Sequence, residues 1–464
     1  MTSVTVYEFG ALVPGTGGEP VACSSTSDSA RSVPPDVFKW LEAQALRLSD
    51  AGETAWLKLT QRRGLRAVQV SSYVGVIRTP SGYQIEVLPK VAKAKPNGEG
   101  DDEARRLLIE MLCCLGGFRH IQTQSAHLAA KHMPLLEVFI GEFLRTVEHV
   151  VKRGLRSDYN TQQDNLFALR GKLQIAGHLR HNLCRRDRFF TEFDEFVPNR
   201  PENRLLHAAL RRALSWTASH ANQQLARELC FAFADVPVST QTSEDFQRVR
   251  PDRGMAHYDG ALAWARLILQ DESPLTGTGE HHAPSLLFPM EAVFEAFVAK
   301  HLASQVSPDS GFTLHKQLRS FSLVNHNRQE WFRLKPDLLI KKDEGNRLVL
   351  DTKWKLIDGK QGTGSQKYGL SQADIYQLYA YGQSYLSGKG GLVLIYPSTA
   401  DFHKPLPVFE FPSAPGLRLW VLPFCLHCKC LLPPPNDIDG AAFSRVQAGA
   451  RCCTCQQAES AVST

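Results

Sequence analysis

The stretch from Trp331 to Trp354 constrains the fold of this chain more than any other. Apolar residues alternate along its two arms, and residues 341–346 between them include the Asp, Gly and Asn that turns favour, so the stretch predicts a β-hairpin. If the hairpin is symmetric about Glu344, Asp337 lies opposite Asp351 on the same face of the sheet. Two carboxylates that face each other destabilise a sheet. A divalent cation between them removes that repulsion, and Mg²⁺ suits a pair of carboxylates that is completed by waters and phosphate.

The residues around these two aspartates resemble the motif of the PD-(D/E)xK nucleases. Pro336-Asp337 supplies its first half and Asp351-Thr352-Lys353 its second. The resemblance implies that Asp337, Asp351 and the carbonyl of Thr352 hold Mg²⁺, which polarises the scissile phosphate and activates a water. Lys353 then positions that water and offsets negative charge in the transition state. The alternative interpretation is an ordinary surface hairpin with acidic residues near its turn.

The segment before the hairpin predicts a helix over Leu286–Leu302, because its apolar residues recur at helical spacing. Nucleases of this superfamily often carry an acidic residue on the preceding helix. Glu295 or Glu291 fits that description, and we expect Glu295 to be a further metal ligand or to orient one. The alternative is that both glutamates only solubilise an amphipathic helix.

The segment after the hairpin predicts a second helix over Ser371–Leu386, followed by a buried strand at Gly391–Tyr396. Gln377 and Tyr381 are four residues apart and therefore share one helix face. This spacing resembles the Q-x-x-x-Y element of RecB-like nucleases, so Gln377 is expected to orient the lysine or a phosphate; a tyrosine-rich core helix is the alternative. Helix, strand, strand, helix, strand is the order of the nuclease core.

Length and composition indicate the number of domains and the kind of partner. A chain of 464 residues with 43% hydrophobic content predicts two to four domains. Its net charge of +6 fits a nucleic-acid partner. The sequence contains no apolar run of about 18 residues and no secretory signal pattern, so we expect a cytoplasmic protein without a membrane contact.

The fold class predicted from these patterns is a multidomain α+β protein. Residues 1–95 are expected to form a β-rich domain, 96–284 a helical middle region, 285–423 the nuclease domain, and 424–464 a zinc-ribbon-like segment with a tail. The helices of the middle region are expected at Glu103–Leu115, Leu135–Arg153, Asn203–Ala218, Gln223–Ala234 and Met255–Leu269. A basic stretch at 180–188 favours either a contact with DNA backbone or a solvated surface.

Two C-x-x-C pairs near the end of the chain predict a zinc site. Cys425 and Cys428 form the first pair, and Cys452 and Cys455 form the second. Four thiolates complete the tetrahedron that structural Zn²⁺ prefers. His427, Cys430 and Cys453 are further candidate ligands, and a tail of unligated cysteines is the alternative. This segment could grip DNA, contact a partner or only close the domain.

The order of several segments resembles McrC, the nuclease-subunit family of McrBC modification-dependent restriction systems. The matching segments are Tyr73–Lys90, the LRGKL sequence at Leu169–Leu173, Glu202-Asn203, Leu286–Val298 and the Asp337/Asp351/Lys353 hairpin. This resemblance implies that DNA is the substrate and that a hexameric McrB-like AAA+ GTPase recognises methylated DNA. It also implies that the N-terminal β region docks on that motor. The chain itself has no G-x-x-x-x-G-K-[ST] loop for a nucleotide.

Two other functions are compatible with part of the sequence. A stand-alone DNA repair nuclease of the same superfamily needs no motor, but it also needs neither the β region nor the helical middle. A non-catalytic adaptor that binds DNA or activates a motor does not need intact Asp337, Asp351 and Lys353.

Overall fold

The structure is a computed structural model, and it describes most of the chain. The described residues are 3–15, 30–50, 56–62, 64–92, 99–116, 133–250, 253–269, 285–306, 311–318, 320–343 and 345–432. Residues 270–284 lie outside them, as do Cys452, Cys453 and Cys455. Within the described residues no helix is long and apolar enough to cross a lipid bilayer.

The chain divides into two compact units. The first contains residues 1–3, 75–85 and 117–287, and the second contains 4–74, 86–116 and 288–464. The fold is therefore a mixed α+β arrangement of more than one unit, as predicted. The four domain boundaries proposed from the sequence stay a prediction.

Helices dominate the first unit. They are α4 (Leu135–Arg153), α5 (Ile175–Asn182), α6 (Pro201–Trp216), α7 (His220–Ala232), α8 (Thr242–Arg248) and α9 (Asp259–Leu269), with the 3₁₀ turn η2 (Arg253–Met255). The buried faces of α4, α6 and α9 pack together, and Phe139 lies against Trp264 with ring centroids 5.8 Å apart. The helices predicted here are confirmed, with small shifts at their ends.

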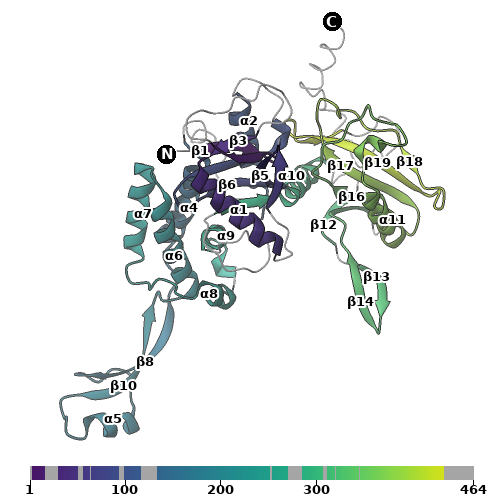
Figure 1. Cartoon of the computed structure of the whole chain (residues 1–464). Coiled ribbons are helices and arrows are strands. Elements are labelled where there is room, and N and C mark those ends of the chain that lie inside the picture. The colour runs from purple at the N-terminus through teal and green to yellow at the C-terminus, as the bar shows by residue number, and fades with distance from the viewer. Residues whose placement is uncertain are drawn as a thin grey trace. The chain divides into compact units, whose positions relative to one another are not determined.

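An arm projects from these helices (Figure 1). Its strands β8 (Asp158–Leu166) and β10 (Phe189–Val197) pair antiparallel, and β9 (Lys172–Leu173) adds to β10 beside α5. Gly171 of the LRGKL sequence has φ of +72°, and a Cβ there would lie 2.3 Å from the carbonyl oxygen of Glu192. Both facts require glycine at this turn. The basic stretch at 180–188 lies on α5 and the loop after it.

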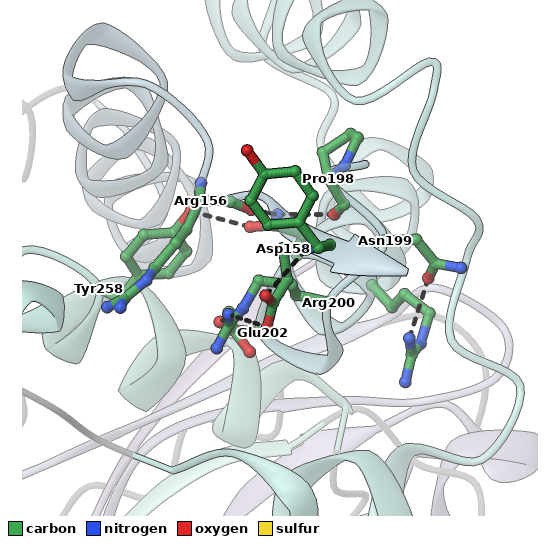
Figure 2. Close-up of polar contacts among 10 residues, drawn as sticks. Arg156, Asp158, Pro198, Asn199, Arg200, Glu202 and Tyr258 are labelled. Carbon is green, nitrogen blue, oxygen red and sulfur yellow. Dashed lines mark hydrogen bonds and ion pairs between the residues drawn. The ribbon is translucent and has the colours of Figure 1, made fainter. Parts of the chain in front are cut away.

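The two strands of the arm meet the helices at a buried asparagine, Asn203 of α6. Its Nδ2 donates to the carbonyl oxygens of Arg156 and Pro198, each at 2.8 Å, and its Oδ1 accepts from the Tyr258 hydroxyl at 2.8 Å. The backbone N–H of Arg156 donates to the same hydroxyl at 2.9 Å. Figure 2 shows Arg156, Pro198 and Tyr258 around this point. One side chain thus holds both strands of the arm where they leave the helices.

The N-terminal part of the chain is rich in β-structure, as predicted. One sheet has the order β3-β2-β5-β4 and is covered by α1, and another has the order β1-β7-β6-β11. The elements are β1 (Ser3–Tyr7), β2 (Ala11–Pro14), β3 (Arg31–Val33), α1 (Pro35–Asp50), β4 (Leu57–Arg62), β5 (Leu65–Val70), β6 (Tyr73–Arg78), β7 (Gln84–Leu88), η1 (Lys90–Ala92), α2 (Glu99–Leu112) and β11 (Ser285–Pro289). β6 and β7 are neighbouring strands of the second sheet and are joined by residues 79–83.

The C-terminal part is built on a larger sheet in the order β12-β15-β16-β17-β19-β18, with β20 paired to β19. Strands β16, β17 and β19 are parallel to one another, and α11 packs on the sheet through Leu378 and Tyr385. The elements are α10 (Met290–Gln305), β12 (Phe312–Lys316), β13 (Phe321–His326), β14 (Gln329–Leu334), β15 (Leu338–Lys342), β16 (Gly345–Thr352), η4 (Lys367–Gly369), α11 (Gln372–Leu386), β17 (Gly390–Pro397), β18 (Phe409–Glu410), β19 (Leu417–Cys425) and β20 (Cys430–Leu431). The buried strand predicted at Gly391–Tyr396 is confirmed as β17.

Two sequence predictions are wrong in detail here. The helix predicted from Leu286 begins only at Met290, because residues up to Pro289 form β11 and a residue before proline avoids the helical conformation. The hairpin predicted from Trp331 is interrupted at residues 335–337, where Pro336 has no N–H for a ladder. Trp331 therefore lies on β14, which pairs with β13 rather than with β16.

Candidate active site

The two aspartates of the predicted hairpin lie at the ends of neighbouring strands. β15 and β16 pair antiparallel with Leu338 opposite Leu350 and Ile340 opposite Leu348, so Asp337 comes opposite Asp351 one step beyond the ladder. The predicted opposition of Asp337 and Asp351 is thereby confirmed. The predicted symmetry does not extend to the turn, because the pairing shifts by one residue between Ile340 and Lys341. Asp337 also bends toward the next residue of β16, since its Oδ2 accepts from both the N–H and the hydroxyl of Thr352 at 2.7 Å.

Asp351 is a buried carboxylate, with 2% of its surface exposed. Its Oδ2 lies 2.6 Å from Nζ of Lys353, which is two residues along the same strand direction and therefore on the same face. Burial, together with the negative charge of Asp337, raises the pKa of Asp351 to about 7 although Lys353 acts in the opposite direction. Burial tends to lower the pKa of Lys353, but the attraction of Asp351 outweighs it and raises that pKa. Asp337 and Asp351 together therefore carry more negative charge than Lys353 alone neutralises.

Helix α11 supplies the next contacts of this lysine. Lys353 Nζ donates to Oε1 of Gln377 at 3.1 Å and lies 3.9 Å from Oδ1 of Asp374. Gln377 Nε2 in turn donates to the Tyr381 hydroxyl at 2.7 Å, and that hydroxyl donates to the carbonyl oxygen of Lys335 at 3.0 Å. The i and i+4 positions of Gln377 and Tyr381 thus connect Lys353 to the segment that leads into Asp337.

The two glutamates of α10 occupy different surroundings. Glu295 accepts from Nε2 of Gln317 at 2.6 Å, and burial followed by the charge of Asp337 raises its pKa. Glu291, one turn earlier, instead adds negative charge at Glu8 and Lys90. The structure therefore brings Glu295, and not Glu291, toward the aspartates.

Asp374 and Gln317 contact this cluster although neither was proposed as a site residue. Asp374 occupies the first turn of α11, three residues before Gln377, so helical spacing alone would have placed it on the same face. Gln317 follows β12, and its N–H donates to the carbonyl of Asp337 at 2.9 Å. No sequence pattern signals that second contact, because it depends on how β12 pairs with β15.

The donor set of this cluster fits a hard divalent cation. All its candidate ligands are oxygens, and the raised pKa of Asp351 marks a carboxylate whose charge is incompletely compensated. No group of three or more His, Cys, Asp or Glu side chains gathers at metal-binding distance in the described part of the chain. A cation here would complete its shell with waters and a phosphate, as Mg²⁺ commonly does.

The first predicted cysteine pair, Cys425 and Cys428, lies at the hairpin of β19 and β20. Cys425 ends β19 and pairs with Cys430 of β20, and the N–H of Cys428 points to Sγ of Cys425 at 3.4 Å. Lys429, the last residue of this turn, has φ of +56°. The partners predicted for these thiols, Cys452 and Cys455, lie outside the described residues.

Residues 68–397 match the family described as the McrBC 5-methylcytosine restriction system component. This match runs from the end of β5 to the end of β17 and includes the aspartate cluster described above. The chain belongs to the McrBC family. The resemblance drawn from the sequence is thereby confirmed.

A solved structure of an McrB–McrC assembly shares the fold. A chain of the tetradecameric assembly of Thermococcus gammatolerans McrB AAA+ hexamers with bound McrC is 19% identical, with a TM-score of 0.66 over 96% of this chain and 100% of that one. A chain of the Thermococcus gammatolerans McrBC complex is 21% identical, with a TM-score of 0.46 over 65% of this chain and 87% of that one. Among curated proteins, none matches this sequence.

Proposed function

We propose that this McrBC family member is the DNA-cutting subunit of a methylation-dependent restriction system. It hydrolyses phosphodiester bonds with Mg²⁺ at a PD-(D/E)xK-type site and acts with a hexameric McrB-like AAA+ GTPase. The observation that carries the proposal is the buried Asp351 opposite Asp337, with Lys353 Nζ 2.6 Å from Asp351.

Each residue of the cluster has a role in this proposal. Asp337, Asp351 and the Thr352 carbonyl would hold Mg²⁺, which when bound polarises the scissile phosphate and makes a coordinated water more acidic. Lys353 holds the attacking water and offsets the charge that develops on the phosphate oxygens. Glu295, whose pKa is raised by burial and by the charge of Asp337, would orient that aspartate or share the cation. Gln377 keeps the lysine amine on this face, since it accepts from Nζ.

The partner in this proposal is supported by the family and by the fold. The family is described as a 5-methylcytosine restriction component, and the structure of similar fold contains McrC bound to McrB AAA+ hexamers. The chain has no phosphate-binding loop of its own, so a partner would have to bind GTP.

The zinc site is a separate part of the proposal and is structural. The turn between β19 and β20 brings the backbone of Cys428 beside Cys425, because the Cys428 N–H donates to Cys425 Sγ at 3.4 Å. Cys452 and Cys455 would complete four thiolate ligands.

Plasmid cleavage tests the nuclease proposal. Methylated and unmethylated plasmids are incubated with Mg²⁺ and the protein, alone and with the AAA+ protein encoded beside it plus GTP. We expect cutting only of methylated plasmid, and only with partner and GTP. Cutting by the protein alone, indifferent to GTP and methylation, would indicate a stand-alone nuclease instead.

Two variants make this experiment specific to the site. Asp351→Asn removes one buried carboxylate and should abolish cleavage while the protein stays folded, because it also relieves repulsion with Asp337. Asp343→Asn changes an acid at the turn end of β15 and should leave cleavage intact. Undiminished cutting by Asp351→Asn would refute the site, and inactivity of the wild type under every condition would favour a non-catalytic adaptor.

A further inference from the structure

The hairpin of β13 and β14 has an unusual surface for an element beside a candidate active site. It forms a two-stranded sheet of its own and extends away from the larger sheet and α11 (Figure 1). Leu323 is 55% exposed, Trp331 44% and Phe332 71%. Apolar side chains gathered on so small an element mark a surface that another molecule covers.

One face of this hairpin combines aromatic, apolar and basic groups. Val324 pairs with Trp331 and Ser322 with Arg333, so the side chains of each pair point to the same face. The His326 ring lies 4.6 Å from that of Trp331 on the same face. The opposite face carries Leu323. Phe332 lies within β14 but outside its paired positions, with φ of +56°, a conformation that aromatic residues rarely adopt.

The base of the hairpin is fixed to the same helix that contacts Lys353. The Tyr385 hydroxyl donates to the carbonyl oxygens of Leu318 at 3.1 Å and Leu334 at 2.9 Å, and its ring lies 4.8 Å from that of Phe321. Tyr381, one turn earlier on α11, holds the carbonyl of Lys335. Two residues after Lys335 comes Asp337. The hairpin therefore has a defined position next to the aspartate cluster.

We infer that the β13–β14 hairpin is a DNA-gripping element that lies in a groove of the duplex being cut. The inference deepens the proposed nuclease function and rests on it. Six residues of strand span about 20 Å, and two paired strands are about 5 Å apart. Such a ribbon fits a major groove about 12 Å wide.

Charge favours DNA over a second copy of the chain. The described residues from β13 to Lys335 carry three permanent cations, Arg328, Arg333 and Lys335, against one carboxylate, Glu330. Arg328 lies in the turn at the tip with φ of +64°, and Arg333 is only 3.6 Å from Glu330 with both side chains more than half exposed. Cations at the tip and edge reach phosphates, while Trp331 and Phe332 supply the apolar contacts that ribbons and wedges make in grooves.

The test measures binding rather than cleavage, so that it is independent of the metal site. Anisotropy of a labelled duplex, in buffer without divalent metal, gives Kd for the full-length protein at several salt concentrations. For Arg328→Ala/Arg333→Ala we expect binding at least about tenfold weaker and a salt slope smaller by about 2, since each phosphate contact contributes about 0.9 to that slope. For Trp331→Ala/Phe332→Ala we expect weaker binding with an unchanged slope.

Matched variants separate this effect from a general loss of charge. Lys360→Ala/Arg418→Ala removes two exposed cations from the same part of the chain and should change Kd by less than about twofold. Glu330→Gln removes the one acid of the hairpin and should bind as tightly as the wild type or more tightly. Equal loss in the matched pair, wild-type affinity in the hairpin variants, or no duplex binding by the wild type would each overturn the inference.

A photocrosslink identifies the occupant directly. With Phe332→p-benzoylphenylalanine, irradiation in the presence of duplex should give a protein–DNA adduct. An adduct with a second copy of the chain, in place of DNA, would assign the hairpin to self-association. The nuclease proposal fails separately, if Asp351→Asn cuts as the wild type does.

Discussion

The indole Nε1 of Trp354 lies 2.9 Å from both carboxylate oxygens of Glu8, although 346 residues separate the two in the chain. Lys90 completes the cluster, because its N–H donates to Glu8 at 3.1 Å and its Nζ donates to the Trp354 carbonyl at 3.2 Å. Trp354 directly follows Lys353. The β-rich N-terminal region is thereby bonded to the chain at the residue after the candidate catalytic lysine.

This cluster predicts a pH-dependent stability. Burial raises the pKa of Glu8 from 4.5 to about 7, against the opposing effect of Lys90 and Trp354 and with a smaller contribution from Glu291. The folded state therefore keeps a proton that the unfolded state has lost, and stability falls as pH rises from about 4.5 to 7. We measure the difference in unfolding free energy between pH 5 and pH 8 by urea denaturation. In Glu8→Gln this difference should be smaller than in the wild type by about 1–3 kcal/mol.

The comparison with Glu8→Ala separates charge from packing. Alanine leaves the buried Trp354 N–H without its acceptor, so that variant should be less stable than the glutamine variant at both pH values. An identical pH dependence in wild type and Glu8→Gln would contradict the titration of Glu8.

Tyr381 provides a prediction about catalysis. Its hydroxyl accepts from Gln377 and donates to the Lys335 carbonyl, so Tyr381→Phe should let Gln377 and Lys353 move without removing a charge. We expect kcat for Mg²⁺-dependent cleavage to fall about tenfold with little change in KM, since the group acts through Lys353 on the transition state. Tyr376→Phe is the matched control, because that tyrosine is exposed on the same helix. Equal kcat in the two variants would show that Tyr381 does not help to position Gln377 and Lys353.

The sequence predicted the elements around the site well because their signals are local. Alternating apolar residues placed β15 and β16, and their apolar pattern gave the opposition of Asp337 and Asp351 without tertiary information. The shift in pairing between Ile340 and Lys341 had no such local signal. The same holds for Gln377 and Tyr381, whose spacing places them on one helix face.

The contacts that the sequence missed are those made by distant segments. Nothing near Glu8 indicates that it meets Trp354, because an isolated glutamate at the end of a strand reads as exposed. The separate hairpin of β13 and β14 was missed because the apolar residues before Pro336 continued the pattern of β15. Only the missing N–H of that proline divides the two strands.

The hydrogen bonds of Asn203 predict how strongly the β8–β10 arm is attached to the helices. Asn203→Ala would remove the donor to the partly buried carbonyl oxygens of Arg156 and Pro198 and the acceptor of the Tyr258 hydroxyl, so we expect the unit to lose about 2–4 kcal/mol of stability. Hydrogen exchange should become faster at the base of β8 and β10 before it does in α4. Asn199→Ala, which removes an exposed contact to Arg204, should change stability by less than about 0.5 kcal/mol. Equal protection in both variants would show that the strands are held by other contacts.

Zinc content tests the cysteine hairpin without any assay of activity. If Cys425, Cys428, Cys452 and Cys455 hold Zn²⁺, the purified protein should contain about one zinc per chain, and a chelator should lower its melting temperature. Cys428→Ser should lose most of the metal and reproduce the effect of chelation, because serine is a poor zinc ligand. We choose Cys428 rather than Cys425, since Cys425 is buried in the sheet. Cys184→Ser, which changes an exposed cysteine on the arm, should keep both zinc and stability. Absence of zinc from the purified protein, together with one melting temperature for the wild type and both variants, would show that these cysteines do not form a metal site.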